Sequence, residues 1–199
     1  DNFYNGSLTL NSSSINILNN TNQLKSNLNN DLIYSGQEYI SFNALESTLG
    51  INIKNLNSVG RNSSEYKSSP QVELMGEINL TTKYPLIKQT KDDINYLTPK
   101  ILLKFNPSDM KNYATSSRTV IVDDIFNSNR LALSDTFETG KSLTLGIDYK
   151  KEKIDNNNKF VEFKLATVLR DKEENFIPKK TSLNKKNSNL FGSVNNNFS

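Results

Sequence analysis

Apolar and polar residues alternate with a period of two along most of the chain. Between residues 142 and 149, for example, Leu143, Leu145 and Ile147 alternate with Ser142 and Thr144. Because successive side chains of a β-strand point to opposite faces, such a stretch places its apolar set on one face. The pattern predicts eight strands, at residues 3–18, 23–34, 38–56, 71–84, 98–106, 140–152, 159–170 and 188–199.

The connections between these strands predict an antiparallel meander, because the short turns and the lack of a helical crossover disfavour parallel neighbours. Three connections are short (35–37, 89–97, 153–158) and three are long (57–70, 107–139, 171–187), while 19–22 departs from this alternation. Alternating loop lengths are typical of outer-membrane barrels, with the long loops outside the cell. The apolar phase also shifts between Leu10 and Ile15, which predicts a bulge in the first strand.

The polar face of the strands leaves two architectures open. Glu73, Glu77 and Lys83 lie on the polar face of one predicted strand. In a soluble sandwich that face meets bulk water, and in a wide membrane barrel it lines an aqueous lumen. The alternation, the strand lengths and the loop lengths favour the two architectures about equally.

Composition narrows the possible functions. The hydrophobic content is 35% and the mean hydropathy is −0.60, and no run approaches the ~18 apolar residues of a membrane helix. The chain holds 31 asparagines, which favour turns over helix interiors. It has no cysteine or histidine, so the usual zinc and haem ligands and the Ser-His or Cys-His nucleophiles are missing.

Charge excludes one further class of partner. The net charge is +3, from 24 basic and 21 acidic residues, and this balance gives no reason to expect nucleic acid. From these observations we expect neither an enzyme nor a bound cofactor or metal.

Two stretches carry a family resemblance, Val122 to Glu152 and Phe160 to Phe198. They resemble the C-terminal barrel region of LptD, the lipopolysaccharide-assembly protein also called organic solvent tolerance protein. The family's loop and strand pattern falls on these positions: Asp124, Phe126, Asn129, Arg130, Glu138, Gly140, Thr144, Gly146 and Tyr149. The stretch from Tyr96 to Phe105 is similar to the family as well. The resemblance covers residues 85–198 and is faint before them.

The resemblance implies an all-β fold, an antiparallel meander that forms an arc of a large transmembrane barrel. Residues 1–199 would be one partial barrel domain, a fragment that eight strands cannot close. The family's periplasmic N-terminal domain and its cysteines have no counterpart here. We therefore expect an open sheet with unpaired edges at 3–18 and 188–199.

The function that the resemblance implies is lipopolysaccharide assembly in the outer membrane of a Gram-negative bacterium. Its partners would be lipopolysaccharide, outer-membrane lipid, a plug lipoprotein of the LptE type and a periplasmic bridge of the LptA type. Two alternatives stay open. One is another outer-membrane barrel, such as a porin, and the other is a soluble carbohydrate-binding or adhesin-like β-sandwich.

Two groups of charged residues are candidates for a role. Arg130 and Glu138 could form an ion pair that pins the long loop, or could be two solvated charges of little energetic value. The basic run Lys179, Lys180, Lys185 and Lys186 could bind lipopolysaccharide phosphates at the cell surface, or could belong to a solvated loop.

The barrel interpretation assigns each face of the later strands. Leu143, Leu145, Ile147, Val161, Phe163 and Leu165 should point outward to lipid, and Ser142, Thr144, Glu162 and Lys164 should point inward. Charge on the lipid face near the bilayer midplane costs on the order of 2–4 kcal/mol. We therefore expect Leu145→Arg to impair assembly and Thr144→Arg to be tolerated.

Overall fold

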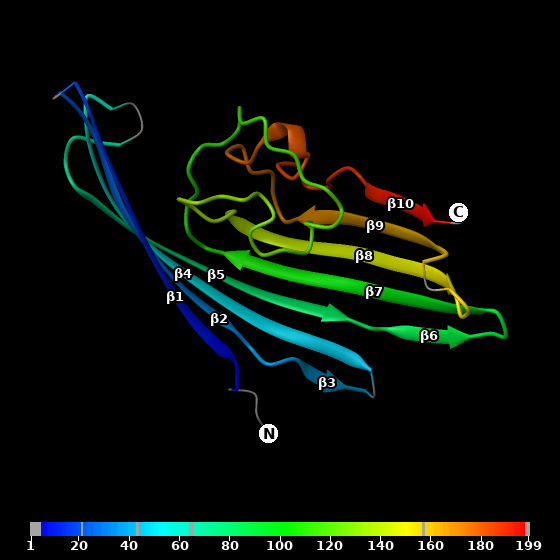
Figure 1. The fold of residues 1–199 in the computed structure, drawn as a ribbon. Coiled ribbons are helices and arrows are strands. Elements are labelled where there is room, and N and C mark those ends of the chain that lie inside the picture. Colours follow the sequence, from blue (N-terminus) through cyan, green and yellow to red (C-terminus); the bar gives the residue numbers. More distant parts are fainter. Residues whose placement is uncertain (1–4, 21, 43, 64–65, 157, 198–199) are drawn as a thin grey trace.

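The chain folds into a single antiparallel sheet of ten strands (Figure 1). The computed structural model describes residues 5–20, 22–42, 44–63, 66–156 and 158–197. The strands are β1 (Ser7–Asn19), β2 (Gln23–Ser35), β3 (Tyr39–Ser41), β4 (Leu45–Arg61), β5 (Gln71–Lys83), β6 (Leu86–Gln89), β7 (Asp93–Asn106), β8 (Gly140–Lys153), β9 (Phe160–Arg170) and β10 (Phe191–Asn197). Among the described residues, helix is confined to the 3-10 turn η1 (Lys179–Thr181).

The strands follow one another as a meander, as the sequence predicted. Their order across the sheet is β1-β2-β4-β5-β7-β8-β9-β10, with β3 paired to β4 and β6 paired to β7. Every pairing is antiparallel. The sheet is not closed, because β1 and β10 each have a neighbour on one side alone. These are the two edges that the sequence predicted.

Several predicted boundaries are wrong. The strand predicted at 38–56 is two strands, since a tight turn separates β3 from β4, and β4 runs on to Arg61. The connection predicted at 89–97 is mostly paired, because β6 and the start of β7 form a hairpin around residues 90–92. The predicted ends at residues 3–4 and 198–199, and Asn157 in the 153–158 turn, lie outside the described residues.

The bulge predicted in the first strand does not form. The register between β1 and β2 is unbroken from Ser7↔Ser35 to Asn19↔Gln23. The phase shift instead moves the apolar residues from one face to the other, so that Leu10 and Ile15 lie on opposite faces of β1. A bulge would insert one extra residue to keep the apolar side chains on one face. β1 does not need it, because the strand is exposed along its whole length and no core requires apolar residues on a given face.

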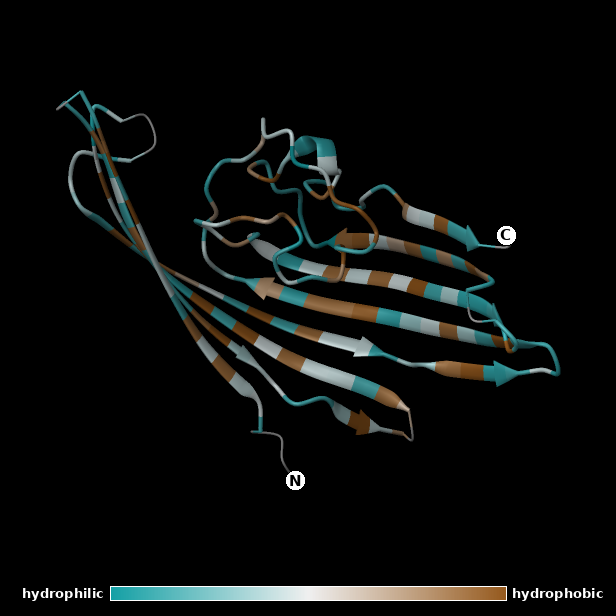
Figure 2. Ribbon diagram, viewed as in Figure 1, coloured by the Kyte–Doolittle hydropathy of each residue, from teal (hydrophilic) through white to brown (hydrophobic). Residues whose placement is uncertain are grey.

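The two faces of the sheet differ in chemistry, and Figure 2 shows the alternation along each strand. We call one the apolar face. Its exposed side chains include Ile78, Leu80, Ile101, Leu103, Phe105, Leu145, Ile147, Phe163 and Leu165. The register places Leu80, Leu103, Leu143 and Leu169 in one row across four neighbouring strands. The predicted division of β8 and β9 residues between two faces is therefore confirmed.

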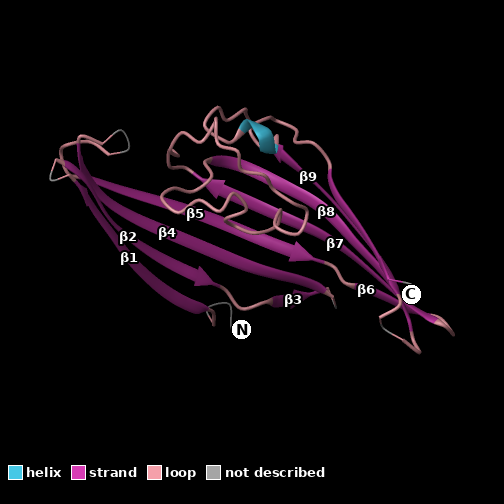
Figure 3. Cartoon of the chain, turned by 45° about the horizontal axis from the view of Figure 1, so that its top comes forward, coloured by secondary structure: helices cyan, strands magenta, loops and turns pink. Residues whose placement is uncertain are grey.

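The opposite face, which we call the loop face, is covered by the two longest connections (Figure 3). Residues 107–139 and 171–190 pack over β7, β8 and β9 and bond to each other through Tyr113 N–H to Phe176 O (2.8 Å). They enclose a buried core with the strands, made of Met110, Val122, Ile125, Leu131, Leu133, Ala166, Val168, Ile177 and Leu183. Over β7, β8 and β9 the polar face of the sheet is therefore covered by the two loops, whose apolar side chains pack against it, and is not exposed to bulk water.

Candidate functional site

A cluster of buried charges lies where segment 107–139 meets the loop face. Arg130 holds Glu138 through two hydrogen bonds, from Nε to Oε2 at 2.8 Å and from Nη2 to Oε1 at 2.6 Å. The two side chains are 0% and 2% exposed. Planar, two-point pairing of this kind fixes both side chains in one geometry, so the structure forms the ion pair that the sequence left as one of two possibilities.

The strands contribute the rest of the cluster. Arg170, at the end of β9, donates to the Glu138 carboxylate and to the carbonyl of Thr139. Lys104 of β7 lies 2.9 Å from Glu77 Oε2 and 3.5 Å from Glu138 Oε2. Glu138 therefore joins segment 107–139 to β7 and β9 at once.

Hydroxyl groups of β8 complete the coordination of Arg130. Its Nη1 donates to Thr144 Oγ1 at 2.8 Å and its Nη2 donates to Ser142 Oγ at 3.1 Å. Thr144 is fully buried. The structure argues against the expected tolerance of Thr144→Arg, because a second guanidinium at this buried position would be forced against Arg130.

The electrostatics of the cluster favour an ionised Glu138. Burial alone would raise the pKa of this carboxyl, but the neighbouring charges of Arg130, Lys104 and Arg170 outweigh it and hold the pKa far below its ordinary value. Three cations face two carboxylates in this cluster, Glu77 and Glu138. Removing one member of this buried network should lower the free energy of unfolding strongly, because its partners would be left as unpaired buried charges. Added salt should have a smaller effect, because buried pairs are screened little.

Two glycines let the loops come this close. Gly140 has φ +86°, a left-handed conformation that side chains disfavour, and a Cβ there would lie 3.0 Å from Arg170 Nη2. At Gly146 a Cβ would lie 2.6 Å from Cζ of Phe126, so the Phe126 ring packs directly on the β8 backbone. Lys100 covers the same ring, with Nζ 5.7 Å from its centroid.

The residues of the resemblance pattern thus fall into two groups. Phe126, Arg130, Glu138, Gly140, Thr144 and Gly146 belong to the contact between segment 107–139 and the sheet. Asn129 braces that segment from within, because its side chain accepts from Leu133 N–H (2.8 Å) and donates to Leu133 O (2.9 Å).

The remaining pattern residues lie apart from this contact. Asp124 is exposed and accepts a bond from the Asn127 side chain at 3.1 Å. Tyr149 is on the apolar face, where it stacks on Phe163 with centroids 6.2 Å apart and donates to Asn95 Oδ1 at 2.9 Å.

The four candidate lysines of segment 171–190 are not part of the cluster. Lys179 and Lys180 lie in η1, and Lys185 and Lys186 follow it. All four are exposed, and none of them takes part in the buried ion pairs.

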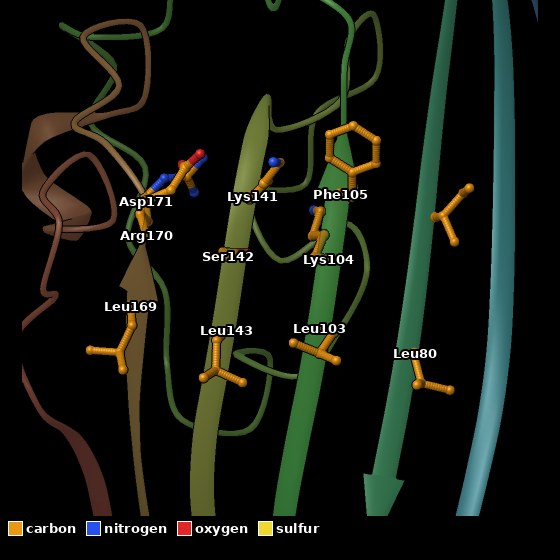
Figure 4. Close-up of a pocket in the computed structure, with 11 residues that line it drawn as sticks. Leu80, Leu103, Lys104, Phe105, Lys141, Ser142, Leu143, Leu169, Arg170 and Asp171 are labelled. Atoms are coloured by element: carbon orange, nitrogen blue, oxygen red, sulfur yellow. The ribbon is translucent and has the colours of Figure 1, made fainter.

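The apolar face carries a hollow of its own. It is a shallow cavity of about 430 Å³, and Figure 4 shows Leu80, Leu103, Leu143 and Leu169 on the strands that line it. Phe105 and Lys141 border its loop end, with Lys141 Nζ 5.6 Å from the Phe105 centroid. The hollow is continuous with the exposed apolar face around it.

Sequence reasoning missed three members of the charged cluster, Glu77, Lys104 and Arg170. Glu77 lies in the middle of β5, and the sequence holds no sign of its role. Lys104 and Arg170 each sit on the polar phase of their strand, close to the end from which a long connection leaves. That position was the available signal, because a long loop folding back over its own strands meets those side chains first.

No family model, no curated protein and no solved structure matches the chain. Within the described ranges, no helix has the length and apolar character to cross a membrane. The same part of the chain holds no group of three or more acidic side chains placed to bind a metal ion.

Proposed function

We propose that this sheet is part of the wall of an outer-membrane barrel that serves lipopolysaccharide assembly. The observation that carries the membrane part is the apolar face. Exposed aliphatic and aromatic side chains continue from β5 to β9 across neighbouring strands. A contiguous exposed patch of this kind marks a surface that something apolar covers, and lipid covers the outside of a barrel.

The opposite face supports the same proposal. Charged and polar side chains of β4, β5, β7, β8 and β9 point to the side that the long loops occupy, and Lys104, Glu77, Arg170 and Thr144 are buried there. In a barrel this side is the lumen. Loops that fold inward and are fixed by ion pairs would narrow that lumen without exposing charge to lipid.

The lipopolysaccharide part of the proposal rests on the family resemblance of residues 85–198. Six residues of the resemblance pattern make one contact: Phe126 packs on Gly146, and Arg130 pairs with Glu138 beside Gly140 and donates to Thr144. Their joint placement gives the sequence pattern a physical reason, since together they hold the long loop on the sheet. The reaction is transport, in which the chain binds and releases a lipid without covalent chemistry.

Lipid contact can be measured directly, because the chain has no cysteine and single cysteines can be labelled. A fluorophore at Leu145 or Phe163 should be quenched by brominated lipid in reconstituted membranes. A label at Thr9, on the opposite face of β1, is the matched control and should respond to an aqueous quencher. Protection of positions 145 and 163 from brominated lipid would contradict the membrane proposal and favour a soluble sandwich.

The cargo needs a separate test. Depletion of the full-length protein from its bacterium should leave newly made lipopolysaccharide inside the cell, where an enzyme acting on the outer leaflet cannot modify it. A porin-like channel would instead leave lipopolysaccharide at the surface and reduce the uptake of small solutes.

A further inference from the structure

The hollow on the apolar face lies at the point where two strands part. In the described part of the chain, β5 pairs with β7 from Ile78↔Phe105 to Lys83↔Lys100, and before Ile78 it pairs with β4 alone. β5, β7, β8 and the end of β9 line the hollow, whose volume of about 430 Å³ falls within the ~300–1,000 Å³ range of ligand sites. Both long segments fold onto the loop face, so the hollow stays open on the apolar face.

The floor of the hollow is aliphatic. A row of leucines from four neighbouring strands forms it: Leu80, Leu103, Leu143 and Leu169 (Figure 4). A hydrocarbon chain lying along this row would remove leucine side chains and its own methylene groups from water together, and each buried group adds to the stability of the complex. The floor therefore suits an occupant that carries an acyl chain.

Two opposite charges border the loop end of the hollow, Lys141 and Asp171 (Figure 4). The register Ser142↔Arg170 makes them neighbours across β8 and the end of β9, and both are exposed. Among the described residues, neither side chain has an ion-pair or hydrogen-bond partner. The Lys141 ammonium lies instead over the Phe105 ring, 5.6 Å from its centroid. A positive and a negative group are thus both available at one end of an apolar hollow.

A lipid head group that carries both charges complements this end. A phosphate pairs with the ammonium of a lysine, and a primary ammonium offers three N–H donors to a carboxylate. A head group with negative charge alone would pair with Lys141 but would also face Asp171, and a like-charge contact of this kind opposes binding. The charges therefore favour a zwitterionic head group with a primary ammonium.

We propose that the hollow binds one phospholipid of the phosphatidylethanolamine type. An acyl chain lies along the leucine row, the phosphate lies at Lys141 and the ammonium lies at Asp171. The site rests on the membrane part of the proposed function and deepens it, because it holds a lipid of defined chemistry at one position on the apolar face.

Binding should be measured on the full chain folded in detergent micelles. The probe is phosphatidylethanolamine with a fluorophore in one acyl chain, and unlabelled lipids with identical acyl chains compete for the site. Phosphatidylethanolamine should compete about fivefold better than phosphatidylglycerol, which has no ammonium, in keeping with the contribution of one exposed charge pair. It should also compete better than phosphatidylcholine, whose ammonium has no N–H to donate.

Charge variants test the head-group contacts. Lys141→Gln and Asp171→Asn should each weaken the binding of phosphatidylethanolamine by up to about fivefold. The matched control is Lys88→Gln, which should leave binding unchanged. Lys88 is an exposed lysine that its pairing with Asn95 places on the apolar face, at the end of the sheet away from the hollow.

A further pair of variants tests the acyl-chain site. Leu143→Trp should fill the hollow and weaken the binding of all three lipids. Leu165→Trp adds the same side chain to the apolar face outside the hollow and should leave binding unchanged.

Three results would overturn the site. Equal competition by the three phospholipids, or equal effects of the two tryptophans, would mean ordinary contact with bulk lipid. Tighter binding of phosphatidylglycerol or of lipopolysaccharide, or an unaltered affinity in Asp171→Asn, would mean that the head group is not zwitterionic. No binding of the probe by the unaltered chain would remove the site altogether.

The quenching test at Leu145 keeps this site separate from the proposed function. Brominated phosphatidylcholine reports contact between position 145 and the bilayer, and that contact does not depend on Lys141 or Asp171. A chain that is quenched at Leu145 but shows no lipid preference would lose the phospholipid site and keep the membrane proposal.

Discussion

Two regions of one sheet share the alternating pattern of apolar and polar residues but differ in the burial of the polar face. In the covered wall, which is β7, β8 and β9 with segments 107–139 and 171–190, the polar face is buried. In the arm, which is β1 and β2, all 13 residues of β1 are exposed, and Figure 1 shows these strands running away from the loops. The burial of a polar face, more than the alternation itself, therefore decides which polar residues that face carries.

The difference lies in how each polar face is satisfied. A buried charge needs partners, and the covered wall supplies them through Arg130, Glu138 and Arg170. β1 is exposed along its whole length, so uncharged serines and asparagines are sufficient on its polar face. Beyond Leu10 the apolar face of β1 also becomes polar, at Ser12, Ser14 and Asn16, which indicates that this end of the arm extends past the apolar band.

The largest expected effect is removal of the central carboxylate of the covered wall. Glu138→Ala would leave Arg130 and Arg170 buried without their shared partner. Breaking a buried ion pair from one side costs about 3–5 kcal/mol, and the free energy of unfolding measured with urea in micelles should fall by that amount. The control is Asp124→Ala on the exposed part of the same segment, where the change should stay within about 0.5 kcal/mol. Equal effects of the two variants would mean that burial does not separate the regions.

Titration removes the same charge without a mutation and has a smaller effect. The pKa of Glu138 lies below its ordinary value of 4.5, so the stabilisation is complete above about pH 4.5 and is lost as the pH falls toward the folded pKa. Unfolding measured between neutral pH and pH 3 should therefore show falling stability in the unaltered chain. In Glu138→Gln this acid dependence should be shallower, and an unchanged slope would place the acid sensitivity elsewhere.

Much of the sheet was predictable because alternation is a local property. The division of Leu145 from Thr144 follows from period two, and the meander follows from the short turns between the strands. The open edges were expected from the family resemblance. The failures come from contacts distant in sequence. Period two gave no sign that segment 107–139 folds back onto the sheet, so Thr144 was expected to face water and Arg170 was not singled out. At β1 the opposite error arose, because an exposed strand does not need the bulge that its phase shift predicted.

An intermediate effect is expected where the loop touches the sheet without charge. Gly146→Ala adds a Cβ that would lie 2.6 Å from Phe126, and overpacking of this kind costs about 1–3 kcal/mol. The matched control is Gly76→Ala on β5, where a Cβ would meet nothing within 4 Å. The urea midpoints of the two variants provide the comparison. A Gly76→Ala variant that is destabilised as much as Gly146→Ala would show that backbone freedom, not the Phe126 contact, governs both positions.

The smallest effect is expected in the arm, where the comparison can be sharpened by measuring exchange as well as stability. Ser12→Ala removes the hydrogen bond to Asn30 Oδ1 (2.7 Å) at a fully hydrated site, and surface changes of this kind stay within about 0.5 kcal/mol. The amides of β1 should also exchange with deuterium faster than those of β8, because an edge strand that buries no side chain opens locally at little cost. In Glu138→Ala the exchange of β8 should accelerate while that of β1 stays the same. Acceleration of both strands together would mean that the arm and the covered wall unfold as one unit, and the contrast between them would then be one of surface chemistry alone.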